Sequence, residues 1–141
     1  MPRLLDTLLD RACAAAPAAL RHDLIVFGSA PMVFAGLKGD VSFDLDLFAS
    51  DAAYEALRAA GFAEDHDEIG IPRLLIAPQV EVVREWPDTR FGDVDASAKA
   101  VEGSRGFRVA ALEHVRAWKE RSVRQKDRDE AAVIRAALGR R

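Results

Sequence analysis

The sequence predicts a mixed α/β (α+β) domain with a central mixed sheet flanked by helices and followed by C-terminal helices. Short apolar runs that stop at glycine or polar clusters alternate with segments of helical periodicity. The last part of the chain has helical periodicity only. The chain has 141 residues, of which 50% are hydrophobic, enough for one domain with its own core. We therefore expect a single domain over 1–141, with a core over about 22–108 and a helical part over about 109–138.

The expected elements follow the apolar pattern and the residues that begin and end helices and strands. Pro17 disfavours continuation of the first helix, Gly28 stops the first strand, Ser29 is a candidate cap for a short helix, and Ser50 or Asp51 caps the next one. In chain order we expect a helix over 3–16, a strand over 23–28, a short helix over 29–37, a strand over 42–49, a helix over 50–61, and strands over 73–77 and 80–86.

Three further segments complete the predicted order. The stretch 63–72 is polar and predicts a loop, while 91–110 predicts a strand, a turn at "GSRG" and a short return strand. From about Ala110 the chain predicts two helices that meet near "RQKDRDE". Their apolar positions are Leu112, Val115, Trp118, Val123, Ile134 and Leu138.

Charge and cysteine content narrow the class of protein. The net charge of −3 gives no large basic field for a nucleic-acid backbone, although many of the 20 Lys and Arg residues follow residue 104 and allow a local basic surface. Cys13 is the single cysteine, which predicts a reduced, cytoplasmic protein. No signal peptide and no membrane-spanning run are expected.

Two aspartates in the strand "SFDLDLFA" need an explanation. Residues two apart in a strand face the same side, so Asp44 and Asp46 project together while Phe43, Leu45 and Leu47 are expected to point into the core. Two convergent carboxylates repel each other and are costly to bury, but they suit a hard cation such as Mg²⁺. The alternative is an edge strand whose two charges are simply solvated.

A second Asp-x-Asp pair and the chemistry of a phosphatase are alternatives to this metal site. Asp93 and Asp95 lie among polar residues and no phosphate-binding turn precedes them, so we assign them no metal role. The stretch "VSFDLDLF" also resembles the start of haloacid-dehalogenase-type phosphatases. That family has Gly-Thr where Leu47 and Phe48 stand, and lacks a preceding strand-turn-helix unit, which argues against it.

The stretch "VFGSAPMVFAGLKGDVSFDLDLF" resembles the nucleotidyltransferase superfamily of the DNA polymerase β type. The shared order is a hydrophobic strand, Gly-Ser, a short connection and then Asp-x-Asp between hydrophobic residues. The resemblance implies a nucleotidyltransferase fold in which Gly28 and Ser29 hold a triphosphate at the start of a helix. It also implies that Asp44 and Asp46 bind one or two Mg²⁺ or Mn²⁺ ions.

That superfamily carries a third carboxylate on a neighbouring strand. Glu81 is the candidate, because it lies between Val80 and Val82 as the odd charge in an apolar run. Glu85 and Asp88 are rivals that lie toward the end of the same strand. An edge-strand glutamate facing water is the other interpretation of Glu81.

The C-terminal stretch "FRVAALEHVRAWKERSVRQKDRDEAAVI" is similar to the tail of small bacterial nucleotidyltransferase-like proteins, including abortive-infection and toxin–antitoxin families. Residues Lys119, Arg124, Lys126, Asp127 and Asp129 match that pattern. In a continuous helix the two lysines share one face. Lys119 either binds nucleotide or belongs to a salt-bridged hinge, and for the arginine and the two aspartates the hinge is favoured.

The resemblance implies transfer of a nucleoside monophosphate from an NTP to a hydroxyl, with Mg²⁺ or Mn²⁺ as cofactor. Asp44, Asp46 and Glu81 are the expected catalytic and metal residues, and Gly28, Ser29 and Lys119 the expected nucleotide-binding ones. The acceptor is unidentified and is RNA, a protein such as a toxin or antitoxin partner, or a small molecule. Two alternatives remain open, a degenerate antitoxin or partner-binding module and an RNA-modifying toxin. No membrane partner is expected, and assembly as a homodimer is left open.

Overall fold

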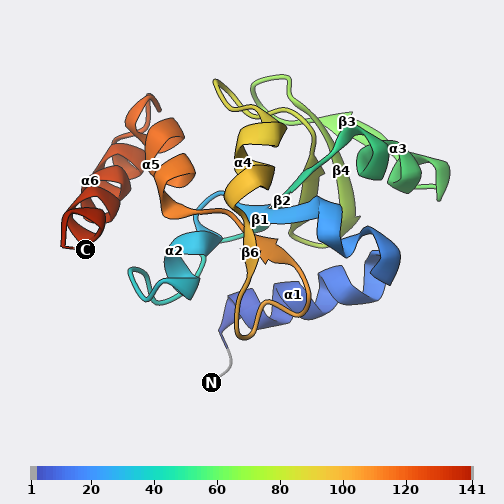
Figure 1. Cartoon of the computed structure of the whole chain (residues 1–141). Coiled ribbons are helices and arrows are strands. Elements are labelled where there is room, and N and C mark those ends of the chain that lie inside the picture. Colours follow the sequence, from blue (N-terminus) through green and yellow to red (C-terminus); the bar gives the residue numbers. More distant parts are fainter. Residues whose placement is uncertain (1–2, 141) are drawn as a thin grey trace.

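The structure of the chain is a computed structural model, which describes residues 3–140 (Figure 1). The helices are α1 (Leu4–Ala15), a 3-10 helix (Ala18–Asp23), α2 (Ala30–Phe34), α3 (Asp51–Ala59), α4 (Phe91–Ser97), α5 (Leu112–Glu120) and α6 (Gln125–Gly139). The strands are β1 (Leu24–Phe27), β2 (Leu45–Ala49), β3 (Glu64–His66), β4 (Pro72–Ala77), β5 (Val80–Val83), β6 (Lys99–Ala100) and β7 (Arg108–Val109).

The strands form one mixed sheet in the order β3-β4-β5-β2-β1-β7-β6. The β2–β5 and β1–β7 pairs are parallel, and the other neighbouring pairs are antiparallel. The prediction of a mixed α/β protein with a central sheet and flanking helices is therefore confirmed. The central position of β2, between β5 and β1, places the Asp-x-Asp segment in the middle of the sheet.

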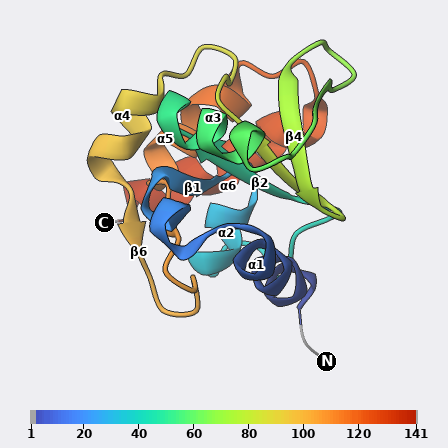
Figure 2. The same cartoon turned by 90° about the vertical axis from the view of Figure 1, so that its right-hand side faces the viewer.

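Apolar clusters cover both faces of the sheet. On one face α1 and α3 pack on β-strand side chains that include Leu45, Leu47, Val80 and Val82. On the other face α4, α5 and α6 pack on Ile25, Phe27, Met32, Phe48 and Val83. Figures 1 and 2 show α3 on one side of the sheet and the α5–α6 pair on the other. The second face is apolar only toward one end, and charged residues of β2 and β5 occupy its remainder.

Several expected boundaries are confirmed. The helix α1 buries the predicted stripe of Leu5, Leu8, Leu9 and Ala12 and ends before Pro17. The side chain of Ser50 caps α3 by accepting a hydrogen bond from the backbone N–H of Ala53. The turn at residues 103–106 also forms, between β6 and β7.

Two segments contain secondary structure that the sequence pattern did not predict. The expected loop over 63–72 contains β3, a three-residue edge strand whose acidic and histidine side chains give no apolar alternation, because its backbone alone pairs with β4. The segment 91–110 contains the expected strand, turn and return strand as β6, residues 103–106 and β7, but it begins with the helix α4, which was not expected and in which Val94 is the single buried residue. One buried residue in seven leaves no helical period to detect.

Three side-chain expectations were also wrong. Phe43 is 68% exposed instead of buried, because it precedes β2 and lies outside the sheet. Val123 is 92% exposed, since it lies in the linker over 121–124 that separates α5 from α6. Ser29 precedes α2, but its side chain caps no backbone N–H group of that helix.

The C-terminal helices α5 and α6 form a helical hairpin at one end of the molecule (Figure 1). The linker interrupts the helix, so Lys119 and Lys126 do not share one continuous helical face. The longer of the two, α6, has 15 residues and carries several charges. Within residues 3–140 no helix is both long and apolar enough to cross a bilayer.

Candidate functional site

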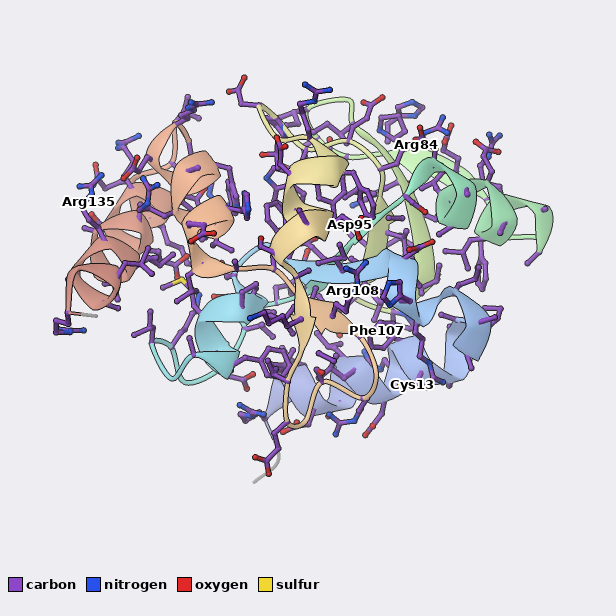
Figure 3. All side chains as sticks on the ribbon, viewed as in Figure 1. Cys13, Arg84, Asp95, Phe107, Arg108 and Arg135 are labelled. Atoms are coloured by element: carbon purple, nitrogen blue, oxygen red, sulfur yellow. The ribbon has the colours of Figure 1, made fainter. Side chains whose placement is uncertain are left out.

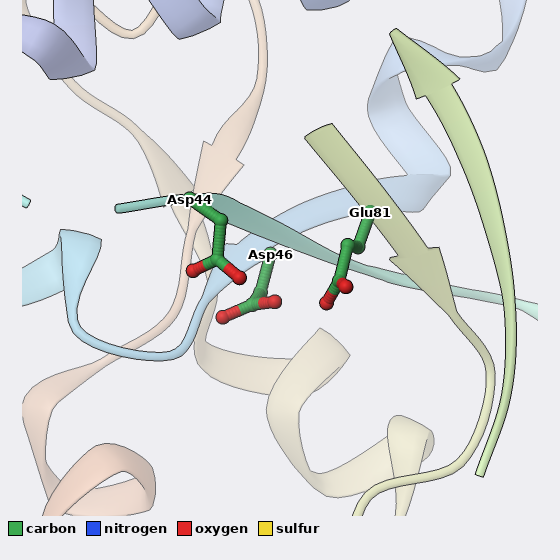
Figure 4. A group of neighbouring side chains, drawn as sticks. All are labelled: Asp44, Asp46 and Glu81. Atoms are coloured by element: carbon green, nitrogen blue, oxygen red, sulfur yellow. The ribbon is translucent and has the colours of Figure 1, made fainter. Parts of the chain in front are cut away.

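Three carboxylates converge at the open part of the second sheet face. Asp44 lies immediately before β2, Asp46 is in β2, and Glu81 is in β5. One oxygen atom from each lies within 4.8 Å of the others, and Figure 4 shows the three side chains pointing toward one another. We call these residues the acidic triad. The predicted pairing of both aspartates with Glu81 is confirmed as a geometric fact.

The parallel register of β2 and β5 explains the convergence. Asp46 and Glu81 are direct partners across the two strands, so their side chains leave the sheet on the same face. Leu45 and Leu47 alternate with Asp46 and are fully buried on the opposite face. A shift of one residue in either strand would turn a carboxylate into the apolar core and a leucine of β2 or a valine of β5 out of it, so the apolar core fixes the register of the triad.

The environment of the triad disfavours negative charge. Burial, followed by the charges of Asp44 and Glu81, raises the pKa of Asp46 well above its ordinary value. Burial, followed by the charge of Glu81, also raises the pKa of Asp44. Both effects are relieved by a proton or by a cation that binds the carboxylates. Carboxylate oxygens at this separation are ligands suited to a hard divalent ion.

Gly28 ends β1 directly beside the triad. Its φ of +65° lies in the left-handed region, and a Cβ atom there would lie 2.5 Å from Oδ2 of Asp46. The residue must therefore be glycine for two independent reasons, the backbone conformation and the close approach of the Asp46 carboxylate. The backbone turn at Gly28 and Ser29 forms one edge of the same site.

Gly28→Ala is expected to lower the free energy of unfolding by about 2 kcal/mol or more, because the methyl group adds a steric clash to a strained φ. It should also displace the Asp46 carboxylate and weaken any cation binding at the triad. Thermal unfolding of the variant with and without divalent metal measures both effects. Gly36→Ala is the matched control, because Gly36 has a φ of +76° but open space around its Cβ position. Equal losses of metal binding in the two variants would contradict the steric argument.

Lys119 lies next to this edge but is fully buried. Its Nζ donates to Oγ of Ser29 at 2.8 Å, to Oε1 of Glu130 at 2.7 Å and to Oδ1 of Asp127 at 3.3 Å. Two carboxylates thus neutralise the ammonium group, which makes Lys119 a link between α5, α6 and the Gly28–Ser29 turn. The ion pair between Lys119 and Asp127 joins the two helices, as the salt-bridged hinge interpretation expects. Asp129, by contrast, accepts a hydrogen bond from the side chain of Gln125. The Nε atom of Arg124 lies 3.9 Å from Oδ2 of Asp127.

Glu130 was not identified from the sequence, where it is one of several charges in "KDRDE". It also accepts a hydrogen bond from Nζ of Lys38 at 2.7 Å, and its side chain is 13% exposed. Burial alone would raise its pKa, but hydrogen bonds from Lys119 and Lys38 outweigh that effect and lower the pKa to about 2.

The lowered pKa of Glu130 predicts an acid-sensitive contribution to stability. The folded-state value of about 2 lies below the ordinary 4.5, so this stability is fully present above pH 4.5 and is lost as pH falls toward 2. Denaturant unfolding of wild type and Glu130→Gln at pH 7 and pH 3 measures the effect. The difference between the two proteins should shrink at pH 3, and a constant difference would contradict the assignment.

A cleft of about 600 Å³ extends from the acidic triad to the α5–α6 linker. Its far side carries three basic residues, Arg121, Arg124 and Lys126, which we call the cationic wall. Trp86 and Trp118 also line the cleft, with their rings in an edge-to-face contact 5.0 Å apart. The cleft therefore combines carboxylates, cations and aromatic surface within one space.

Both tryptophans belong in part to the core. Trp86 and Trp118 pack against the buried ring of Phe27, at centroid distances of 4.7 Å and 6.3 Å. Their indole Nε1 atoms are buried without a hydrogen-bond partner. The rings are thus held by the core and still present surface to the cleft.

The rival acids do not join the triad. Glu85 and Asp88 line the cleft, but among the described residues the cluster able to share one metal ion contains Asp44, Asp46 and Glu81 alone. The second Asp-x-Asp pair lies on α4. There Asp95 is half-buried and pairs with Arg108 at 2.5 Å, and Figure 3 labels both residues.

Arg73 on β4 is a residue of the site that sequence reasoning missed. Its guanidinium donates to Oδ1 of Asp65 at 2.8 Å and also to Oε1 of Glu81. The only sequence signal is that Arg73 and Leu75 alternate with the buried Leu74 and Ile76 in "RLLIA". That alternation predicts an outward-facing arginine but not its partner on another strand.

Comparisons with protein-family models, with curated proteins and with solved structures found no significant match. The chemistry of the cleft is therefore the basis for a function.

Proposed function

We propose that this chain is a metal-dependent nucleotidyltransferase with the nucleotidyltransferase fold. It would transfer a nucleoside monophosphate from an NTP to an acceptor hydroxyl. One observation carries the proposal: three carboxylates from two adjacent strands converge within 4.8 Å beside the Gly28–Ser29 turn. Carboxylates that converge next to a backbone turn at glycine are an arrangement that suits metal-assisted phosphoryl chemistry.

The acidic triad fits Mg²⁺ or Mn²⁺. It offers oxygen ligands only, and a divalent ion would offset the burial and the mutual repulsion that raise the pKa of Asp44 and of Asp46. Asp44, Asp46 and Glu81 would hold the ion. A bound divalent ion would supply charge neutralisation for the triphosphate and for the pyrophosphate that leaves.

The remainder of the cleft suits a nucleotide. A volume of about 600 Å³ is typical of small-molecule sites. The cationic wall lines the same cleft as the triad and would bind phosphate oxygens, while the partly exposed rings of Trp86 and Trp118 would offer an apolar surface for a base. In this proposal Lys119 acts indirectly. Its charge is neutralised by Asp127 and Glu130, and its remaining contact, a hydrogen bond donated to Ser29, would orient the Ser29 hydroxyl.

In the proposed reaction an acceptor hydroxyl oxygen attacks the α-phosphorus. The bond between that phosphorus and the bridging oxygen of pyrophosphate breaks as the new ester bond forms. The carboxylate of Glu81 accepts the proton of the hydroxyl, and the cationic wall holds the departing pyrophosphate. Most of the rate enhancement would come from positioning and from stabilising negative charge.

A partner-binding module without turnover is the second candidate. It is favoured by three large apolar side chains that line the cleft and are strongly exposed, namely Phe43 at 68%, Ile69 at 74% and Val123 at 92%. Exposed apolar residues gathered at one opening are typical of surfaces that another molecule covers. Both candidates use the same cleft and differ in whether a nucleotide is consumed.

Incubation with each α-labelled NTP, Mg²⁺ or Mn²⁺ and cell extract distinguishes the two candidates. Label transferred to RNA, protein or a small molecule supports the enzyme and identifies the acceptor. Label that is bound by the chain without pyrophosphate release supports the binding module. Neither transfer nor nucleotide binding with any of the four NTPs would contradict the proposed function.

Millimolar Mn²⁺ is expected to raise the melting temperature of the wild-type chain, since an ion that binds the folded state alone stabilises it by mass action. Asp44→Asn should reduce the shift by removing one ligand. Because protons compete for carboxylates with raised pKa values, the shift should be smaller at pH 5 than at pH 8. Differential scanning fluorimetry measures all three effects. A wild-type melting temperature that Mn²⁺ leaves unchanged at pH 8 would remove the metal from the proposal.

A further inference from the structure

A row of charged side chains crosses four adjacent strands on the open sheet face. Cross-strand register places Asp65 of β3 opposite Arg73 of β4, and Glu81 of β5 opposite Asp46 of β2. Arg73 lies two residues before Leu75, the partner of Glu81, so it shares the face of Glu81 and reaches it diagonally. The row therefore reads negative, positive, negative, negative, and its positive member adjoins the acidic triad.

Arg73 is tied to both of its acidic neighbours. Its Nε donates to Asp65 and its NH1 group to Glu81, and the side chain is 24% exposed. Within residues 3–140, no other side-chain cation forms an ion pair with any member of the triad. Arg73 is thus the resident positive charge of a site that otherwise carries three carboxylates.

A guanidinium at Glu81 has two opposing effects on a divalent ion at the triad. It orients the Glu81 carboxylate, which favours binding, and it repels the ion while occupying one carboxylate oxygen, which disfavours binding. The repulsion acts between one and two positive charges a few ångströms apart in a partly buried site. The orientation is already set by the β2–β5 register, so the repulsion is the larger effect.

We propose that Arg73 is a positioning residue that substitutes for the divalent ion in the metal-free protein and sets its affinity. The inference rests on the metal site of the proposed function. When the ion binds, Glu81 exchanges its contact with Arg73 for the metal, and Asp65 keeps the guanidinium close by. Two opposite consequences follow. Removal of Arg73 tightens metal binding. Removal of the Asp65 carboxylate weakens metal binding, because Arg73 then has Glu81 as its one acidic partner and competes more strongly with the ion.

The test is the binding of Mn²⁺ alone to the full-length chain at pH 8, measured from the EPR signal of the free ion. Arg73→Gln is expected to bind Mn²⁺ at least about tenfold more tightly than wild type, and to melt at a lower temperature than wild type in EDTA. Asp65→Asn should bind Mn²⁺ about threefold more weakly. Arg84→Gln is the matched control, since Arg84 pairs with Glu55 at 2.8 Å and contacts no member of the triad. Its affinity for Mn²⁺ should stay within about twofold of wild type.

The outcomes separate this inference from the proposed function. If wild type binds Mn²⁺ and Arg73→Gln binds it with equal or lower affinity, the proposed role of Arg73 is overturned but the metal site is supported. No binding by wild type or by Arg73→Gln overturns both. If Arg73→Gln does not fold with or without Mn²⁺, Arg73→Lys decides, because an ammonium group lacks the fork that bridges two carboxylates. Binding by Arg73→Lys that is at least about threefold tighter supports the inference, and unchanged or weaker binding overturns it.

Discussion

Asp46→Asn is expected to reduce nucleotidyl transfer by at least about a hundredfold, because it removes one of the three carboxylates that would hold the cation. Transfer from the NTP identified by the labelling experiment measures the loss. The variant should fold at least as well as wild type without metal. The raised pKa of Asp46 means that its ionised form destabilises the folded state above the ordinary pKa, so a neutral amide removes that penalty at pH 7.

The control for Asp46→Asn is Asp93→Asn in the second Asp-x-Asp pair. Asp93 is exposed in the first turn of α4. Asp95, in contrast, pairs with Arg108, so its substitution could lower activity by disturbing the structure. We expect an inactive, stable Asp46→Asn beside a fully active Asp93→Asn. An active Asp46→Asn would remove the triad from the chemistry.

Lys119→Met should produce the largest loss of stability, about 3–5 kcal/mol, because it leaves Asp127 and Glu130 as buried carboxylates without their shared cation. For a chain of this size the loss corresponds to a fall of roughly 10 °C in melting temperature. Thermal and denaturant unfolding at pH 7 measure it. The α5–α6 pair should also become more susceptible to proteolysis, since Lys119 links it to Ser29.

Lys126→Met is the matched control for Lys119→Met. Lys126 is exposed and donates only to Oγ of Ser42, so its loss should change stability by less than about 1 kcal/mol. Adding Asp127→Asn to Lys119→Met should restore part of the lost stability, because Asp127 is left with Arg124 at 3.9 Å as its cation, whereas Glu130 keeps its ion pair with Lys38. A Lys119→Met variant as stable as Lys126→Met would show that the buried network contributes little.

The triad could be predicted because each of its strands alternates charge with apolar residues. Asp46 lies between Leu45 and Leu47, and Glu81 between Val80 and Val82, so the core fixes both their register and the face from which the carboxylates project. The choice of Glu81 over Glu85 followed from the same pattern. Local periodicity was sufficient here because the apolar partners of each acid are its own neighbours in sequence.

The contacts of Arg73 and Lys119 could not be predicted in the same way. Arg73 meets Asp65 and Glu81 across two strand pairings, and Lys119 meets Ser29, which lies 90 positions earlier in the chain. A charged residue carries no sequence signal that names its partner, and only tertiary structure decides between solvent and an ion pair. The edge strand β3 was missed for a related reason, because backbone pairing with β4 defines it.

The parallel pairing of β2 with β5 has a consequence for when the site can exist during folding. Asp46 and Glu81 become neighbours only after α3, β3 and β4 have closed the intervening loop, a non-local step that is slow compared with helix formation. The cationic wall comes from residues 121–126, later still in the order of synthesis. A growing chain therefore lacks the triad until strand β5 has left the ribosome, and lacks the cationic wall of the cleft until α6 begins to emerge.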